Sequence, residues 1–196
     1  VILANFYPFW EGADIEYALS YVNRMLDLTQ AISDGKKVIV TETGWPSLGG
    51  NVESAKPSEQ NAMKYFINVQ DWAEHKNVEL FYFSSFDESW KVKQEGAVGA
   101  RWGIWNKYEE LSYRREDYQS KIEVDFTDYV GVDFKEMSTE TLENLWRKTL
   151  EKGMHGLCFS MYEDGQKPGD VITEEQVRRR IEIIKPYTKW IRSFSC

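Results

Sequence analysis

The sequence predicts an α/β protein built on a parallel β-sheet. Short apolar runs alternate with longer segments whose apolar residues recur at helical spacing, a pattern typical of strand–helix–strand units. In such folds function resides where the carboxyl ends of the strands meet. The segments around Pro8, Glu42 and Glu88 each follow an apolar run, so we expect them to lie together at that edge.

The first half of the chain is expected to form three strands and two helices. Asp14 and Ser58 are typical N-cap residues, and each precedes a segment of helical spacing. A Gly-rich loop is expected over 95–105. The strands are expected at 1–9, 37–40 and 78–86.

The second half begins with a charged, Tyr-rich connector at 107–136, in which one short strand is expected at 122–126. A helix should begin at Ser138 and end at Gly153. Thr173 to Gln176 reads as a capping box that opens a further helix. The remaining strands are expected at 155–161 and 189–196.

Composition limits the partners of the protein. The 196 residues are enough for one sizeable core, and 24 Lys and Arg against 32 Asp and Glu give a net charge of −8. An acidic chain argues against nucleic acid and against an anionic membrane surface as partners. Cys158 and Cys196 lie in apolar runs and read as small buried side chains, with no disulfide framework, metal spacing or cofactor motif.

No targeting or membrane-spanning segment is recognisable, which leaves secretion and a cytoplasmic location both open. Both termini fall inside predicted strands, so we expect further chain beyond Val1 and Cys196. Aromatic residues are abundant, with 8 Trp, 11 Tyr and 10 Phe. Such residues commonly fill cores, but several lie here in loop-like stretches, where they would also suit a sugar-binding cleft.

A family resemblance rests on four motifs. Residues 41–47 (TETGWPS) resemble the nucleophile motif of family 17 glycoside hydrolases, the β-1,3-glucanase family. Residues 5–9 (NFYPF) are similar to the strand that precedes it, 86–91 (FDESWK) to the last barrel strand, and 101–105 (RWGIW) to the loop that follows. The resemblance implies a (β/α)8 TIM barrel and an endo-β-1,3-glucanase-like enzyme that cleaves glucan with retention of configuration.

The motifs occur in an unusual order. Residues 157–166 resemble the first strand of the family barrel and 189–195 the second, so the chain follows the order six, seven, eight, one, two. The resemblance therefore implies an incomplete, circularly permuted barrel without strands three to five. Residues 1–106 would form its C-terminal part, 107–136 a connector and 137–196 its N-terminal part, within one structural domain.

Such a sheet would have two exposed parallel edges, which natural proteins avoid. We therefore expect missing chain, a complementary barrel fragment, or a swapped copy of the same chain. A permutant, a junction between tandem copies and a split protein all fit this order of motifs.

The resemblance also assigns roles to residues. Retaining glycosidases use two carboxyl groups about 5 Å apart, and Glu42 corresponds to the nucleophile. The family's general acid lies in a Gly-Asn-Glu motif that this sequence lacks, so we expect it outside the chain. Glu88 and Lys91 are expected to support Glu42 by hydrogen bonding and charge, and the expected sugar contacts are Tyr7, Phe9, Trp45, Trp90, Trp102, Trp105 and Tyr162.

Simpler interpretations remain open for these residues. Glu42 would also suit a capping or salt-bridging role in a loop, and Glu88 with Lys91 an ordinary surface pair at i,i+3 spacing. Arg192 falls within a predicted strand and is expected to pair with a carboxylate in the barrel. At the level of function, a β-1,3-glucanosyltransferase and a catalytically silent glucan-binding half-barrel are alternatives to the hydrolase, with β-glucan as the partner in each.

Overall fold

A five-stranded parallel sheet forms the centre of the molecule, as the alternation of strands and helices predicts. The computed structural model describes residues 1–113 and 131–194. The strands lie in the order β1-β2-β3-β4-β5, and each pairs in parallel with the next. They are β1 (Ile2–Asn5), β2 (Val38–Thr43), β3 (Leu80–Tyr82), β4 (Met154–Phe159) and β5 (Thr188–Ser193).

The helices begin where the sequence predicts, because their first turns carry their own caps. The longer helices are α1 (Ile15–Ala31), α2 (Glu59–Lys76), α4 (Thr139–Lys152) and α5 (Glu174–Ile184). Their N-cap residues are Asp14, Ser58, Ser138 and Thr173. Each cap side chain accepts a hydrogen bond from a backbone N–H two or three residues later, which satisfies a donor that the helix leaves unpaired.

The capping box at Thr173 is only half formed. The Thr173 side chain accepts from the backbone N–H of Gln176, as predicted. The Gln176 side chain, however, does not return to the cap. Its Nε2 donates to the carbonyl oxygen of Met161 at 2.6 Å and so ties α5 to the segment after β4.

Several predicted bounds are wrong in instructive ways. The strand expected over 78–86 is only three residues long, and β2 extends to Thr43 instead of ending at Val40. The loop expected over 95–105 begins as helix α3 (Val92–Gly99), which follows the 3₁₀ turn η1 (Ser89–Lys91) and is kinked at Gly96, where φ is 71°. A second 3₁₀ turn, η2 (Lys185–Tyr187), precedes β5, and the short strand predicted at 122–126 lies outside the described residues.

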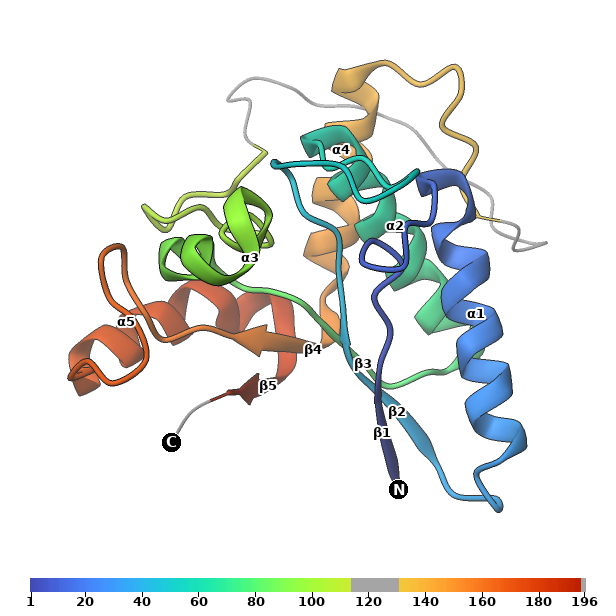
Figure 1. Ribbon diagram of the computed structural model, residues 1–196, viewed down its shortest axis with the longest axis horizontal. Coiled ribbons are helices and arrows are strands. Elements are labelled where there is room, and N and C mark those ends of the chain that lie inside the picture. Colours follow the sequence, from blue (N-terminus) through green and yellow to red (C-terminus); the bar gives the residue numbers. More distant parts are fainter. Residues whose placement is uncertain (114–130, 195–196) are drawn as a thin grey trace.

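The layers follow from burial along the strands. The central strands β2, β3 and β4 are mostly buried, and helices α1, α2 and α4 pack next to one another at the outer side of the sheet (Figure 1). The strands fan out strongly, with β1 and β2 running up the picture and β4 and β5 across it, as a right-handed twist requires. No helix in the described part of the chain is both long and apolar enough to cross a membrane.

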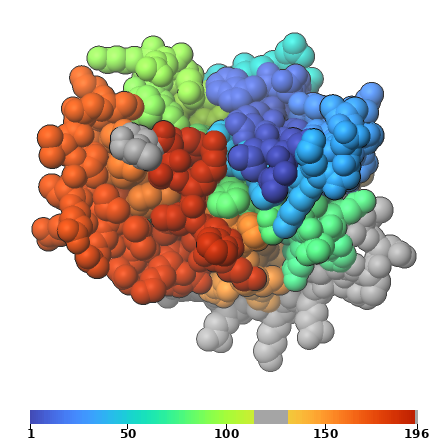
Figure 2. Space-filling view, turned by 90° about the horizontal axis from the view of Figure 1, so that it is seen from below, coloured from blue at the N-terminus to red at the C-terminus, as the bar shows by residue number. Residues whose placement is uncertain are grey.

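The two outer strands are exposed. Every residue of β1 and β5 is at least partly accessible, and the large apolar residues Leu3 (66% exposed) and Trp190 (62% exposed) lie on them. Figure 2 shows the N-terminal residues in dark blue and the C-terminal residues in red, both at the surface of the same face. Among the described residues, the sheet therefore ends in two unpaired parallel edges.

Two glycines allow backbone segments to approach at the carboxyl ends of the strands. A Cβ atom on Gly44 would lie 2.0 Å from the carbonyl oxygen of Phe83, and one on Gly103 would lie 2.3 Å from the backbone nitrogen of Asp87. Both contacts are to backbone atoms that cannot rotate away. Glycine at these positions therefore brings the segments after β2, β3 and α3 together.

We predict that Gly44→Ala lowers the free energy of unfolding by about 1–3 kcal/mol, the usual cost of forcing extra atoms into a packed site. The matched control is Gly50→Ala in the same loop, because a Cβ there meets no atom within 4 Å. Urea denaturation measures both. Equal stability of the two variants would contradict the predicted clash.

Candidate functional site

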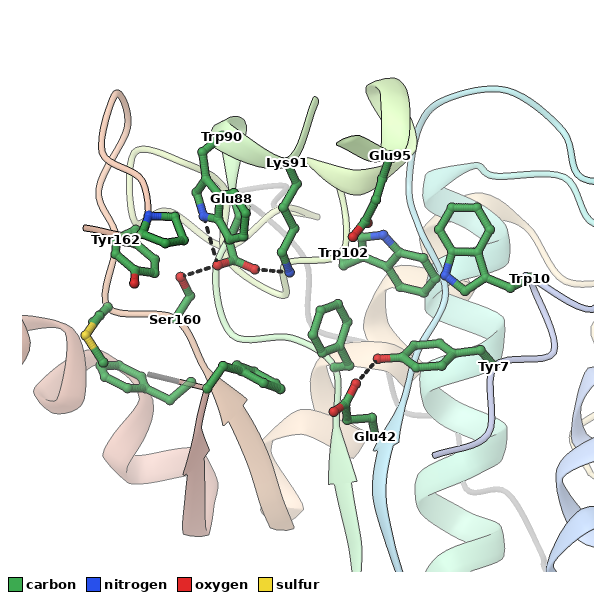
Figure 3. Close-up of a pocket in the computed structure, with 15 residues that line it drawn as sticks. Tyr7, Trp10, Glu42, Glu88, Trp90, Lys91, Glu95, Trp102, Ser160 and Tyr162 are labelled. Atoms are coloured by element: carbon green, nitrogen blue, oxygen red, sulfur yellow. Dashed lines mark hydrogen bonds and ion pairs between the residues drawn. The ribbon is translucent and has the colours of Figure 1, made fainter. Parts of the chain in front are cut away.

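A pocket of about 500 Å³ opens at the carboxyl ends of the strands. Segments that follow or end all five strands contribute to it (Figure 3), which is where parallel α/β folds place their sites, and its size suits a small ligand. The residues that line it are Tyr7, Trp10, Glu42, Phe83, Glu88, Trp90, Lys91, Glu95, Trp102, Phe159, Ser160, Met161, Tyr162, Pro168 and Phe194.

Glu42 lies at the floor of the pocket, and a donor holds each of its carboxylate oxygens. The Tyr7 hydroxyl donates to Oε2 at 2.6 Å, and Arg192 on β5 donates from Nη1 to Oε1. The Glu42 side chain is only 13% exposed. The two donors fix the plane of the carboxylate, and the prediction that Arg192 pairs with a carboxylate is confirmed.

The groups around Glu42 keep their protons. Burial, reinforced by the neighbouring Glu42, raises the pKa of Tyr7, so its hydroxyl remains a hydrogen-bond donor. Burial opposes the charged form of Arg192, but hydrogen bonding and attraction to Glu42 outweigh it and raise the pKa of the guanidinium. Burial also raises the pKa of the Cys158 thiol to about 12, so this buried cysteine, which donates to the carbonyl of Thr41, is unreactive.

Glu88 is held still more tightly than Glu42. Its Oε1 accepts from Trp90 Nε1 at 3.2 Å and from the Ser160 hydroxyl at 2.8 Å, while Oε2 forms an ion pair with Lys91. Glu88 and Lys91 are both buried. The simpler interpretation of this i,i+3 pair as a surface salt bridge is therefore wrong, because both charges lie against the pocket (Figure 3).

The ion pairs in the pocket differ from those that the resemblance predicts. Lys91 was expected to tune Glu42, but it pairs with Glu88, and its Nζ lies 4.5 Å from the Phe83 ring centroid and 5.5 Å from that of Trp90. In the part of the chain that the structure describes, the cation bonded to Glu42 is Arg192.

The pocket walls are aromatic. The Tyr7 ring meets the Trp102 ring edge to face at 5.6 Å, and Trp10, 40% exposed, lies 5.8 Å from Trp102. Opposite them, the rings of Trp90 and Tyr162 meet at 5.9 Å. Four of the predicted contact residues, Tyr7, Trp90, Trp102 and Tyr162, thus line one pocket.

The other three predicted rings lie outside the lining. Phe9, Trp45 and Trp105 are at most 3% exposed and belong to the hydrophobic core. Phe9 packs edge to face on both Trp45 and Trp102, and Trp45 also donates to the Lys56 carbonyl. Phe9 thus backs the Trp102 wall, whereas Trp105 packs on Phe86. None of the three rings lines the pocket.

Sequence reasoning missed several lining residues. Ser160 and Glu95 carry no motif that would single them out. The sequence predicts a loop at Glu95, whereas this residue lies on α3 and lines the pocket. The apolar lining residues Phe83, Phe159, Met161 and Phe194 sit in or beside strand-like runs, where an apolar residue ordinarily signals a core.

Asp87, next to Glu88, fastens the loop behind the pocket. It accepts from the backbone N–H of Gly103 at 3.0 Å and pairs with Arg101 at 3.1 Å. Burial raises the pKa of Asp87 to about 6, although both donors act to lower it. No set of three or more His, Cys, Asp or Glu side chains within 1–113 and 131–194 is arranged to hold a metal ion.

Comparison with known proteins identifies the family. A model of the BtgE/BtgC glycoside hydrolase domain matches residues 1–103, a segment that includes the Glu42 and Glu88 motifs. The chain belongs to this family.

Named relatives of this family member act on β-1,3-glucan. Glucan 1,3-β-glucosidase of Saccharomyces cerevisiae is 30% identical over 124 residues, covering 57% of this chain and 38% of that protein. The probable glucan endo-1,3-β-glucosidase btgC of Aspergillus terreus is 32% identical over 110 residues, covering 47% of this chain and 16% of that protein. The chain thus spans less than two fifths of the length of either relative.

Solved structures of similar proteins point to the same family. The crystal structure of a family 17 β-1,3-glucanosyltransferase from Rhizomucor miehei shares 35% identity and a TM-score of 0.53, covering 56% of this chain and 40% of that one. An active-site mutant of the Rhizomucor miehei enzyme, with 34% identity and a TM-score of 0.51, is in complex with laminaritriose. The α/β fold of this chain, and the relationship to family 17 glycoside hydrolases that the motifs suggested, are therefore confirmed.

The raised pKa of Asp87 predicts a pH dependence of stability. The folded-state pKa of about 6 lies above the usual value of about 3.9 for an unfolded chain, so folding favours the protonated acid. The contribution of Asp87 is therefore fully present below about pH 4 and is lost as pH rises through about 6, a decline of roughly 3 kcal/mol at about 1.4 kcal/mol per pKa unit.

Urea denaturation at several pH values measures this effect. The decline should be absent in Asp87→Asn, whatever the absolute stability of that variant. Asp164→Asn is the contrast, because hydrogen bonds from Ser89 and Lys107 lower the pKa of Asp164, so that its contribution is lost as pH falls. Parallel curves for wild type and Asp87→Asn would contradict the assignment.

Proposed function

We propose that the chain supplies the nucleophile half of a retaining glycoside hydrolase acting on β-1,3-glucan, with Glu42 as the nucleophile. The observation that carries this proposal is the Glu42 carboxylate, held by Tyr7 and Arg192 at the floor of an aromatic pocket. The names of the relatives, glucan 1,3-β-glucosidases among them, support the substrate class.

The chemistry follows from this arrangement. One Glu42 oxygen attacks the anomeric carbon of a glucose unit, the glycosidic bond breaks, and a covalent glycosyl-enzyme forms. A general acid protonates the departing sugar oxygen, and the same group then activates the water that releases the product. Arg192 and Tyr7 hold the Glu42 carboxylate in the orientation that attack requires.

The general acid is proposed to lie outside this chain. The sequence has no Gly-Asn-Glu motif, and within the described residues Glu88 is bonded to Trp90, Lys91 and Ser160. Glu88 and Lys91 are therefore proposed to shape the site and set its charge. This two-carboxylate chemistry requires no cofactor.

The aromatic walls suit a sugar ligand. Tyr7 and Trp102 on one side and Trp90 and Tyr162 on the other present flat apolar faces to the pocket. Glucose units carry C–H faces of the same shape, and their neutral charge fits a chain of net charge −8. Trp10, more exposed than these four rings, is proposed to extend the Trp102 wall toward solvent.

The architecture proposed is an incomplete, circularly permuted barrel. Residues 1–106 would provide strands six to eight, 107–136 the connector, and 137–196 strands one and two, within one structural domain. The parallel pairing of β3 with β4 supports this arrangement, because strands eight and one are neighbours in a closed barrel. The exposed edges and the partial coverage of relatives support a partner, either a complementary barrel fragment or a swapped copy.

Two other functions have specific support. The Rhizomucor miehei neighbour is a β-1,3-glucanosyltransferase, in which a sugar acceptor would replace water in the second step. The absence of the Gly-Asn-Glu motif favours a silent glucan-binding half-barrel instead. Product analysis separates all three: longer oligosaccharides indicate transfer, only shorter ones hydrolysis, and binding without any product a silent protein.

In the complete protein, Glu42→Gln should reduce turnover of a laminarin-type glucan by more than about 1,000-fold, because the covalent intermediate cannot form. Oligosaccharide binding should persist. Release of reducing sugar and tryptophan fluorescence measure the two properties. Glu182→Gln is the control, since that residue is exposed and its ion pair within the described residues is with Lys185. Turnover that survives in Glu42→Gln would refute the nucleophile.

The open edges predict association of the isolated 1–196 chain. Sedimentation velocity should show concentration-dependent assemblies, and Leu3→Lys combined with Trp190→Lys should reduce them, because charge on an edge opposes strand pairing. Tyr17→Lys is the control, since Tyr17 is 70% exposed but lies on α1. A chain that stays monomeric at all concentrations, or an equal effect of Tyr17→Lys, would contradict an edge-mediated partner.

A further inference from the structure

Arg180 on α5 is completely buried, which is unusual for a charged residue. Its guanidinium carbon lies 4.2 Å from the centroid of the Phe86 ring. Glu109 pairs with its Nε at 2.9 Å. Burial lowers the pKa of Arg180, and Glu109 opposes that shift.

Arg180 holds the backbone that carries one wall of the pocket. Its Nη1 donates to the carbonyl oxygens of Ser160 at 3.2 Å and Tyr162 at 2.6 Å. Its Nη2 is buried without a hydrogen-bond partner among the described residues. A buried donor left unpaired costs free energy. The guanidinium is therefore placed to donate to the two carbonyls, even though one of its own N–H groups stays unpaired among the described residues.

The two carbonyls belong to residues that face the site. The Ser160 hydroxyl donates to Glu88, and the Ser160 backbone N–H donates to the Ser85 hydroxyl at 3.0 Å. Phe86, under the guanidinium, lies two residues before Glu88 along the chain. Arg180 thus touches both segments that meet at the Glu88–Ser160 hydrogen bond, and it lines no part of the pocket itself.

We propose that Arg180, held by Glu109, is a positioning residue that sets the placement of Glu88 in the pocket through Ser160. Displacement of the Ser160 segment would remove one of the two hydrogen bonds to Glu88 Oε1 and shift the carboxylate relative to Trp90 and Lys91. The expected effect on sugar binding rests on the function proposed above, whereas the effect on the geometry of Glu88 does not.

Arg179, the residue just before Arg180, offers a matched control. Arg179 also pairs with Glu109, at 3.0 Å, and with Glu163. Its side chain is about half exposed. Within the described residues, the guanidinium bonded to the Ser160 and Tyr162 carbonyls is that of Arg180. Arg179→Lys and Arg180→Lys therefore make the same chemical change on the same helix, and both affect Glu109. Only Arg180→Lys removes the guanidinium group that donates to both carbonyls. A lysine ammonium cannot reproduce its planar geometry.

The indole N–H resonances of tryptophan provide a readout without ligand. Trp90 Nε1 donates to Glu88, whereas Trp45 donates to the Lys56 carbonyl and Trp72 to Asn23. Trp90→Phe assigns the first signal. Arg180→Lys should move the Trp90 signal and leave those of Trp45 and Trp72 in place, and Arg179→Lys should move none of them.

Binding of laminaritriose to the complete protein provides the second readout. Arg180→Lys should weaken binding about tenfold, because small displacements of a positioned group are costly. Ser160→Ala should weaken it similarly, and the double variant should be no weaker than the worse single one, since both act on the same hydrogen bond. Full additivity would overturn the route through Ser160.

The outcomes separate the two proposals. An unmoved Trp90 signal in Arg180→Lys, or movement of all three tryptophan signals, would overturn the positioning role. If Arg180→Lys does not fold, Glu109→Gln should move the Trp90 signal in the same way by a smaller amount, and no movement there would also overturn it. A wild-type protein that does not bind laminaritriose refutes the proposed function, while the Trp90 signal still decides the role of Arg180.

Discussion

The junction between β3 and β4 is the constraint on which the rest of the structure depends. It joins segments about 75 residues apart in sequence, through the pairing of Phe81 with Gly156 and Tyr82 with Leu157. The backbone N–H of Ser85 continues it by donating to the Cys158 carbonyl at 2.9 Å. Gly156 makes the junction possible, because a Cβ there would lie 2.5 Å from the Phe81 ring. Ser160 and Glu88 meet where this junction reaches the pocket.

Glu42 and Glu88 differ in how they are held in the pocket. Glu42 receives its donors from the two edge strands, Tyr7 after β1 and Arg192 on β5. Glu88 receives Trp90, Lys91 and Ser160 as donors from the segments after β3 and β4. The orientation of Glu42 therefore depends on both ends of the sheet being in register, whereas that of Glu88 depends on its centre.

Local signals in the sequence predicted local structure well. Asp14, Ser58 and Ser138 start helices because a cap acts within one turn. Helix α3 was missed because it is short and interrupted by Gly96. The site was partly predictable because residues after strands gather at one edge, which places Tyr7, Glu42, Glu88 and Lys91 correctly around one pocket.

Long-range features could not be predicted in the same way. Aromatic residues serve cores and ligands alike, so nothing local distinguishes buried Trp45 and Trp105 from lining Trp90. Arg192 was expected to find a carboxylate, but its partner lies 150 residues away and depends on the whole sheet. Ser160 gave no signal, since its importance comes only from the neighbour to which it donates.

The all-parallel sheet has a consequence for how the chain folds. Parallel neighbours require long crossover connections, so every strand pairing in this sheet joins residues distant in sequence. Such non-local contacts slow folding, because loop-closure entropy is lost before the contacts form. While the central strands find their register, the apolar edge residues Leu3 and Trp190 stay open to other chains. Yield of native protein should therefore depend on how long these edges stay exposed during synthesis.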